Sequence, residues 1–298
     1  MSDCCLNILS DHIRPNRAFS FVIFAAFVLV AISSISAQRL AVISPEPGEE
    51  ADIFADGLAA RLSAHFRVIE RSAAETAFDS LSIDSPFNQT TEETSRAGAL
   101  IGADMIIYTR VITQRRSSFE RDKHFESSAS IFVSGDRSGK LHLFQLVTAE
   151  EDSEEKAFSS LLLKCDEIAT TIAVAIPELY RKELSAKPIN KISDHSRGNG
   201  QNDDETKPPM PYRRISPRYT SEAFLFGIQA TVDVEVDVSD TGNVTNIHVI
   251  RWAGYGLERS VAAAIREMNW RPAEHKGKNL PMRVMLRYNF TKAEKAEN

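Results

Sequence analysis

Within Thr231–Val238, the residues from Val232 onwards alternate strictly between valine and acidic side chains, and this pattern constrains the fold more than any other in the chain. Successive side chains of a strand leave on opposite faces, so the segment predicts a strand with one buried face and one acidic face. The turn that follows, Ser239–Gly242, ends in a glycine that is free to take a positive φ. The alternating residues are Val232, Asp233, Val234, Glu235, Val236, Asp237 and Val238.

The residues after this strand predict the rest of a small ββαβ domain within residues 211–292. We expect a second strand over Asn243–Trp252, a helix that begins near Leu257, and a final strand over Leu280–Phe290. One face of the helix is apolar and should cover the valines, and both tryptophans should belong to the core. These core residues are Leu257, Val261, Ala264, Ile265, Met268, Trp252 and Trp270.

Six separated blocks in this region resemble the C-terminal domain of TonB-family energy transducers. Their order and spacing match that family over about a quarter of the chain. The blocks are Pro217-Arg218-Tyr219, Gly227-Ile228, Asp240-Thr241-Gly242-Asn243-Val244, Leu257-Glu258-Arg259-Ser260-Val261, Trp270-Arg271-Pro272-Ala273 and Arg287-Tyr288-Asn289-Phe290.

The resemblance implies an energy transducer whose C-terminal domain captures a peptide segment of an outer-membrane transporter by β-strand addition. It also implies ExbB/ExbD-like motor proteins in the inner membrane as partners, and it leaves a homodimer open. The pattern favours Pro281–Phe290 as the exposed edge strand, although its two arginines have a second interpretation as charges that protect such an edge. The expected peptide contacts are Arg218, Tyr219, Arg283, Met285, Arg287 and Asn289.

An uncharged apolar segment occupies residues 18–37, after a short amino-terminal stretch, residues 1–17. A predominantly apolar segment of twenty residues is long enough to span a bilayer, and Arg14 and Arg17 should keep the amino end cytoplasmic. The segment therefore predicts a single-pass inner-membrane anchor with a periplasmic C-terminus. Small residues near its end equally allow a signal peptide that is cleaved after Ala37, which would leave a periplasmic protein.

Residues 38–185 predict an α/β domain with a mixed sheet whose first strands are parallel. We expect helices over Glu50–Ala64, over 73–81 with Ser72 as N-cap and Glu75 completing a capping box, and over Phe158–Leu184. Glu150–Glu155 should be an acidic loop. The domain resembles those of CsgG-like and TolB-amino-terminal-like envelope proteins, which implies a scaffold or assembly role. The carrying segments are 40–43, 55–58, 66–71 and 101–107.

The segment 186–210 is polar and predicts a disordered linker between the two domains, and residues 293–298 predict a short tail. Members of the TonB family usually carry a longer proline-rich rod at this place. If the chain crosses the periplasm, the α/β domain must therefore serve as part of the spacer.

Charge and motifs exclude several function classes. The net charge is −6, and residues 38–185 hold 16 Lys and Arg against 25 Asp and Glu, which argues against nucleic-acid binding. Gly135–Lys140 lacks the spacing of a phosphate loop, and the seven histidines show no metal-ligand spacing. We therefore expect no enzyme, cofactor or metal site. The alternative to an energy transducer is a passive periplasmic interaction or assembly protein, because the segment 18–37 contains no histidine that could couple to a motor.

Overall fold

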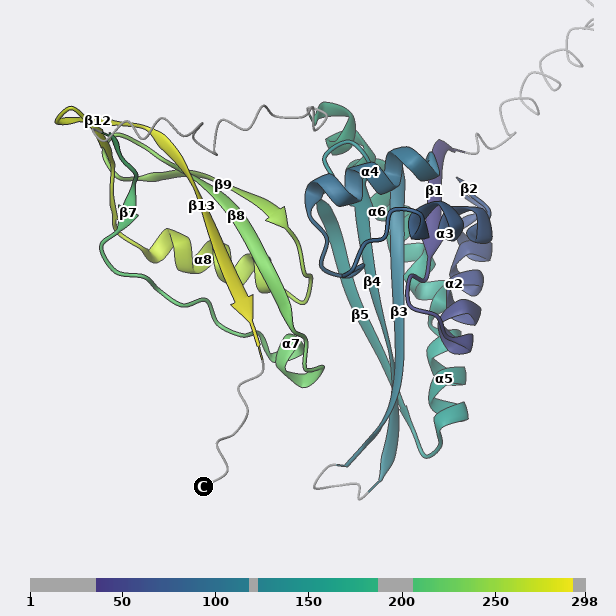
Figure 1. Ribbon diagram of the computed structural model, residues 1–298. Helices are drawn as coiled ribbons and strands as arrows, with labels where there is room; N and C mark the ends of the chain where they lie inside the picture. Colours follow the sequence, from purple (N-terminus) through teal and green to yellow (C-terminus); the bar gives the residue numbers. More distant parts are fainter. Residues whose placement is uncertain (1–35, 118–122, 187–205, 292–298) are drawn as a thin grey trace, which may run out of the picture. The chain divides into compact units, whose positions relative to one another are not determined.

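The structure, a computed structural model, describes residues 36–117, 123–186 and 206–291 (Figure 1). The chain divides into two compact units, residues 1–36 and 37–298, and all four sheets described below lie in the second unit, apart from the first residue of β1, Ser36. The predicted segments 1–17 and 293–298 lie outside the described residues. So does 18–37, apart from its last two residues, which begin a strand. Within the described ranges, no helix combines the length and apolarity needed to cross a membrane.

Residues 38–185 form the predicted α/β domain around a five-stranded mixed sheet with the order β2-β1-β3-β4-β5. Strand β1 pairs with β3 in parallel, as expected, whereas β3, β4 and β5 form an antiparallel meander. The strands are β1 (Ser36–Ile43), β2 (Phe66–Val68), β3 (Met105–Arg116), β4 (His124–Gly135) and β5 (Leu141–Glu151).

Both faces of this sheet contribute buried apolar residues, and alternate residues of β1 belong to different cores. Leu40 and Val42 face a cluster that includes α2, α5 and α6, whereas Ala41 and Ile43 face a cluster that includes α3 and α4. The thiol of Cys165 is fully buried. The helices are α2 (Glu49–Leu62), α3 (Arg71–Asp79), α4 (Thr91–Ile101), α5 (Glu154–Leu163) and α6 (Cys165–Ser185).

The prediction of one long helix over Phe158–Leu184 is wrong, because α5 and α6 are separate. The backbone N–H of Lys164 donates to the carbonyl of Leu161, which closes the last turn of α5 tightly. Its ammonium group donates to the carbonyl of Thr148 at 2.6 Å and so anchors the break to β5. The chain then resumes as α6 at the buried Cys165.

Two further local predictions are wrong. The N-cap of α3 is Glu70 rather than Ser72, because the Glu70 carboxylate accepts from the N–H groups of Ser72 and Ala73 at 3.1 and 2.8 Å. Glu75 accepts instead from the N–H of Ser44 at 2.9 Å. The expected acidic loop 150–155 is shorter than predicted, because its first two residues continue β5 and pair with β4.

The C-terminal domain has the predicted ββαβ order. Its antiparallel sheet has the strand order β13-β8-β9, and α8 lies against one face (Figure 1). All four valines of β8 are at most 1% exposed, and they join the apolar face of α8 in one cluster, as expected. The elements are α7 (Ser221–Leu225), β8 (Ala230–Val238), β9 (Val244–Arg251), α8 (Leu257–Glu267) and β13 (Met282–Phe290).

The predicted linker 186–210 ends too late in the sequence. Residues 206–207 and 210–211 already belong to the C-terminal domain, because they form short strands that pair with β11 and β10 in two small antiparallel sheets. Residues 187–205 lie outside the described ranges. The short strands are β6 (Thr206–Lys207), β7 (Met210–Pro211), β10 (Trp270–Arg271), β11 (Ala273–His275) and β12 (Lys278–Leu280).

Trp252 joins the C-terminal domain to the α/β domain. It is 1% exposed, its indole N–H donates to Thr94 Oγ1 at 3.0 Å, and its ring packs against Tyr108 and Phe132. Trp252 is therefore a core residue, as predicted, but it belongs to a core that both domains share. Such a side chain contributes several kcal/mol, since truncating a buried tryptophan typically costs about 3–5 kcal/mol.

Polar contacts complete this junction. The Asn88 amide donates to the carbonyls of Thr231 and Trp252 at 2.8 and 2.7 Å and accepts from the N–H of Thr231 at 2.9 Å. The hydroxyls of Ser130 and Tyr255 lie 2.8 Å apart. The junction thus satisfies polar groups of both domains as well as burying apolar ones.

Candidate functional site

The outer edge of β13 is the central feature of the candidate site. All nine residues of β13 pair with β8 on one side. On its other side, no strand among the residues that the structure describes pairs with β13. The edge therefore presents backbone N–H and C=O groups that a further strand could use.

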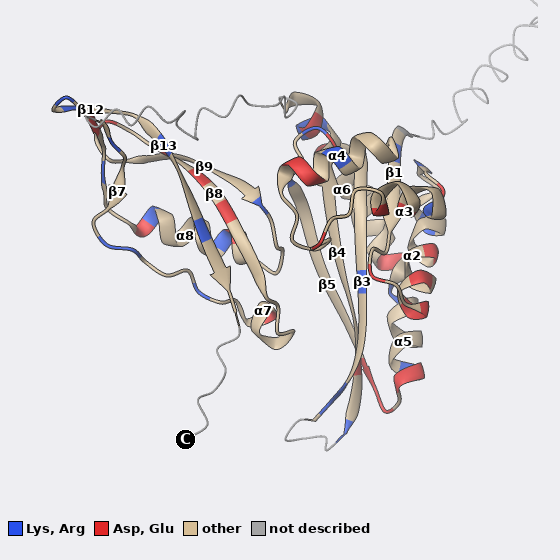
Figure 2. Cartoon of the chain, in the orientation of Figure 1, with Lys and Arg blue, Asp and Glu red and all other residues tan. Residues whose placement is uncertain are grey.

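Four of the six predicted contact residues lie on one face of β13, and three of them are engaged within the sheet. Arg283 forms ion pairs with Asp237 and Glu235 at 2.6 and 3.1 Å. Arg287 pairs with Asp233 at 2.7 Å. Figure 2 shows the acidic residues of β8, in red, beside β13.

The remaining two residues of that face differ from each other. Asn289 Oδ1 accepts from the hydroxyl of Thr231 at 2.9 Å, whereas the Met285 side chain is half exposed. The bond from Arg283 also lowers the pKa of Asp237. The arginines therefore hold the face of the sheet together, and the open backbone edge is what remains for a partner.

A pocket of about 270 Å³ lies beside β13. Four consecutive residues of the strand, 285–288, line it. Because consecutive side chains point to opposite faces, a pocket that touches all four must open along the edge of the strand. Pro211, the last residue of β7, Arg214 and Met268 complete its walls.

The fold and this edge agree with a comparison to known families. The family model described as "Gram-negative bacterial TonB protein C-terminal" matches residues 215–291. This part of the chain is a TonB-family C-terminal domain. No curated protein sequence matches the chain.

Solved structures resemble parts of the chain at low identity. The solution structure of the Pseudomonas aeruginosa TonB C-terminal domain is 23% identical, covers 32% of this chain and 94% of its own, and has a TM-score of 0.26. The Neisseria meningitidis lipoprotein GNA1162 is 17% identical, covers 46% of this chain and 98% of its own, and scores 0.32. The hypothetical protein CT253 from Chlamydia trachomatis is 12% identical, covers 50% and 95%, and scores 0.29.

A TonB-family C-terminal domain indicates a TonB-like envelope protein with a periplasmic C-terminus. In this TonB-family domain, Tyr219 lies at the end of β13. Its hydroxyl donates to the carbonyl of Ile228, and its ring stacks on Phe290 with 6.1 Å between centroids. Tyr219 thus secures the carboxyl end of the edge strand.

Arg218 precedes Tyr219 on the loop before α7 and is attached to α8. Its backbone carbonyl accepts from the hydroxyl of Ser260 on α8 at 2.6 Å, and its side chain is exposed. The six predicted residues therefore divide into four on β13, one packed against its end, and Arg218 on the loop before α7. Whether they contact a partner stays a prediction.

The opposite edge of the TonB-family sheet is partly occupied by the α/β domain. Thr90 forms an antiparallel bridge with Arg251 at the end of β9, and the N–H of Trp252 donates to the carbonyl of Gln89 at 3.0 Å. The Arg251 guanidinium also donates to the carbonyl of Asn88 at 2.7 Å. A strand that runs the full length of β9 would clash with these contacts.

Sequence reasoning missed the residues that build the surroundings of β13. The sequence patterns indicated no role for Pro211 and Arg214 at the edge, and none for Asn88 at the junction. A proline pair and basic residues just before a domain are common in linkers, so no local signal distinguished them. The side-chain amide of Asn88 bonds to residues more than 140 positions away in the sequence.

Proposed function

We propose that this chain is a TonB-like envelope protein whose C-terminal domain captures an extended peptide segment of an outer-membrane transporter by strand addition to β13. One observation carries the proposal: the full-length edge of β13 is unpaired among the described residues, and a pocket opens along it. Backbone hydrogen bonds would supply affinity, and the pocket would select a side chain of the peptide.

Site-directed photo-crosslinking tests this proposal. A crosslinking amino acid at Met285, on β13, is expected to form an adduct with an outer-membrane protein in intact cells. The same amino acid at Thr245 is the matched control, because Thr245 is exposed on β9, the other edge of the same sheet. Adducts at both positions, or only at Thr245, would refute capture at β13.

A proline at Leu286 gives a second test. Proline lacks the N–H that a ladder needs, so Leu286→Pro is expected to abolish partner binding while the α/β domain stays folded. Met285→Pro is the companion variant, because the N–H groups of consecutive residues point to opposite edges of a strand. One of the two variants should lose binding while it keeps the β8–β13 pairing. If both keep binding, the edge is not the docking site.

Energy transduction is the finer part of the proposal. It requires the segment 18–37 to remain as an inner-membrane anchor, in reach of an ExbB/ExbD-like motor. The alternative is a passive periplasmic interaction protein, which the absence of a histidine from that segment favours. The mass of the mature protein decides between them, because an amino terminus at Gln38 removes the anchor and excludes transduction.

A further inference from the structure

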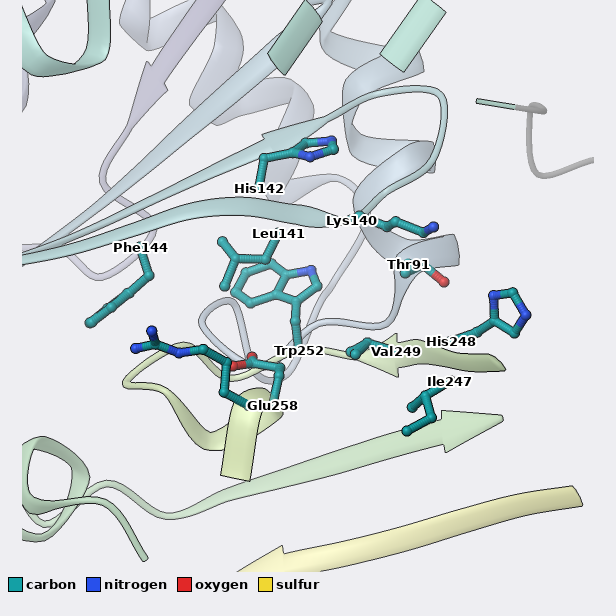
Figure 3. Close-up of a pocket in the computed structure, with 11 residues that line it drawn as sticks. Thr91, Lys140, Leu141, His142, Phe144, Ile247, His248, Val249, Trp252 and Glu258 are labelled. Atoms are coloured by element: carbon teal, nitrogen blue, oxygen red, sulfur yellow. The ribbon is translucent and has the colours of Figure 1, made fainter. Parts of the chain in front are cut away.

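A second cavity, of about 320 Å³, lies where the C-terminal domain meets the α/β domain (Figure 3). Its apolar walls come from both domains. Leu141 and Phe144 belong to β5, Ile247 and Val249 belong to β9, and Trp252 follows β9. Its size is at the lower end of the range for pockets that hold small ligands, and such pockets favour domain interfaces.

Four basic residues also line this cavity, but two of them are already paired. His142 hydrogen-bonds to the buried carboxylate of Glu183, and His248 lies 3.2 Å from Asp237. These imidazoles therefore have partners of their own outside the cavity.

Lys140 and Arg259 are different. Within the described ranges, no carboxylate lies at salt-bridge distance from either side chain, and both residues are exposed. Two cations beside an apolar wall leave the cavity with uncompensated positive charge.

One acidic residue, Glu258, lines the cavity as well, but it is used to hold the backbone. Its Oε1 atom accepts from the N–H groups of Ala253 and Gly254 at 2.6 and 2.7 Å. Burial raises the pKa of Glu258, and even as an ionised carboxylate it balances only one of the two cations. The charge of the cavity therefore stays positive.

We propose that this cavity binds a small amphiphilic organic anion. Its apolar body lies against Leu141, Phe144 and Trp252, and its charge is balanced by Lys140 and Arg259. A ligand there touches both domains at once, so it stabilises their junction by mass action. The site is separate from the edge of β13 and does not depend on the function proposed for that edge.

Fluorescent dyes test the proposal on the fragment 37–298, which constitutes one compact unit with its own cores. Anilinonaphthalene sulfonate is the anionic probe, and N-phenylnaphthylamine is its uncharged counterpart of nearly the same shape. We expect the anionic dye to bind more tightly, with tryptophan-excited emission because Trp252 lines the cavity. Lys140→Ala and Arg259→Ala should each weaken the anionic dye by about threefold and leave the neutral dye unchanged.

Two further variants locate the site. Val249→Trp should fill the cavity and abolish binding of both dyes, while Arg214→Ala, in the pocket beside β13, should change neither. If Val249→Trp fails to fold, the variants of the two exposed cations, Lys140→Ala and Arg259→Ala, still test the proposal. Equal affinity for the two dyes, no binding of either, or a loss with Arg214→Ala in place of Arg259→Ala would overturn the proposal.

Discussion

Asn88→Ala should uncouple the two domains of the fragment 37–298. The Asn88 side chain makes three hydrogen bonds to backbone groups of the C-terminal domain, at 2.7, 2.8 and 2.9 Å. Each such bond contributes about 1 kcal/mol net, so the variant is expected to lose about 3 kcal/mol of unfolding free energy. Alanine cannot replace either the donors or the acceptor.

Urea denaturation followed by tryptophan fluorescence measures this loss. Trp252 lies at the junction, so its emission should shift to longer wavelength as the domains separate, in a transition that precedes unfolding of the α/β domain. The control is Asn246→Ala, because Asn246 is exposed on β9 and its amide oxygen accepts only from the next residue. We expect that control to change stability by less than about 0.5 kcal/mol. If Asn88→Ala costs no more than the control, these hydrogen bonds do not hold the junction.

Three other outcomes follow from the structure. Gly254→Ala should lower the unfolding free energy, measured by denaturant titration, by about 2 kcal/mol more than Gly277→Ala. Both glycines have a positive φ, 73° and 78°, but only at residue 254 would an added Cβ lie 2.7 Å from a phenylalanine ring. Equal losses for the two variants would contradict this. Burial alone would raise the pKa of Glu183, but its hydrogen bonds to His142 and Ser138 lower the pKa in the folded state. The ionised carboxylate therefore contributes to folding stability above the ordinary glutamate pKa of about 4.3. This contribution is lost as the pH falls through the lower folded pKa. Glu183→Gln should flatten this part of the pH–stability curve, and an unchanged curve would exclude the carboxylate as its source. Asp233→Asn should lower stability by about 1–2 kcal/mol, because two arginines bind its buried carboxylate, while the exposed Asp240→Asn should have no effect in the same titration.

The C-terminal fold could be predicted from the sequence because its signals are local. Strict alternation in β8 determines which face is buried, and the apolar stripe of α8 has the period needed to cover that face. The same alternation placed Arg283 and Arg287 on one face of β13. It did not reveal their ion pairs with β8, because the register between two strands is set by the whole sheet.

The errors arose where two local signals competed or where tertiary contacts decided. Ser72 is a favoured N-cap residue type and Glu70 is not, yet the longer carboxylate of Glu70 reached two N–H groups at once. The break at Lys164 depends on a bond to β5, which no helical pattern contains. The junction around Trp252 was unpredictable for the same reason, since Asn88 and Trp252 meet only when both domains are folded.

The bridge between Thr90 and Arg251 occupies part of the β9 edge of the C-terminal sheet, so the two edges of this sheet differ in how much backbone they leave unpaired. A small sheet with two unpaired edges can pair with strands of other molecules at both edges and so extend without limit, as in fibrils. Here residues of the α/β domain obstruct one edge, so within the described ranges the C-terminal sheet offers a single complete docking edge. Recruitment at that edge should therefore stop at a stoichiometry of one strand per copy, and two copies that met through it would close on each other as a finite pair.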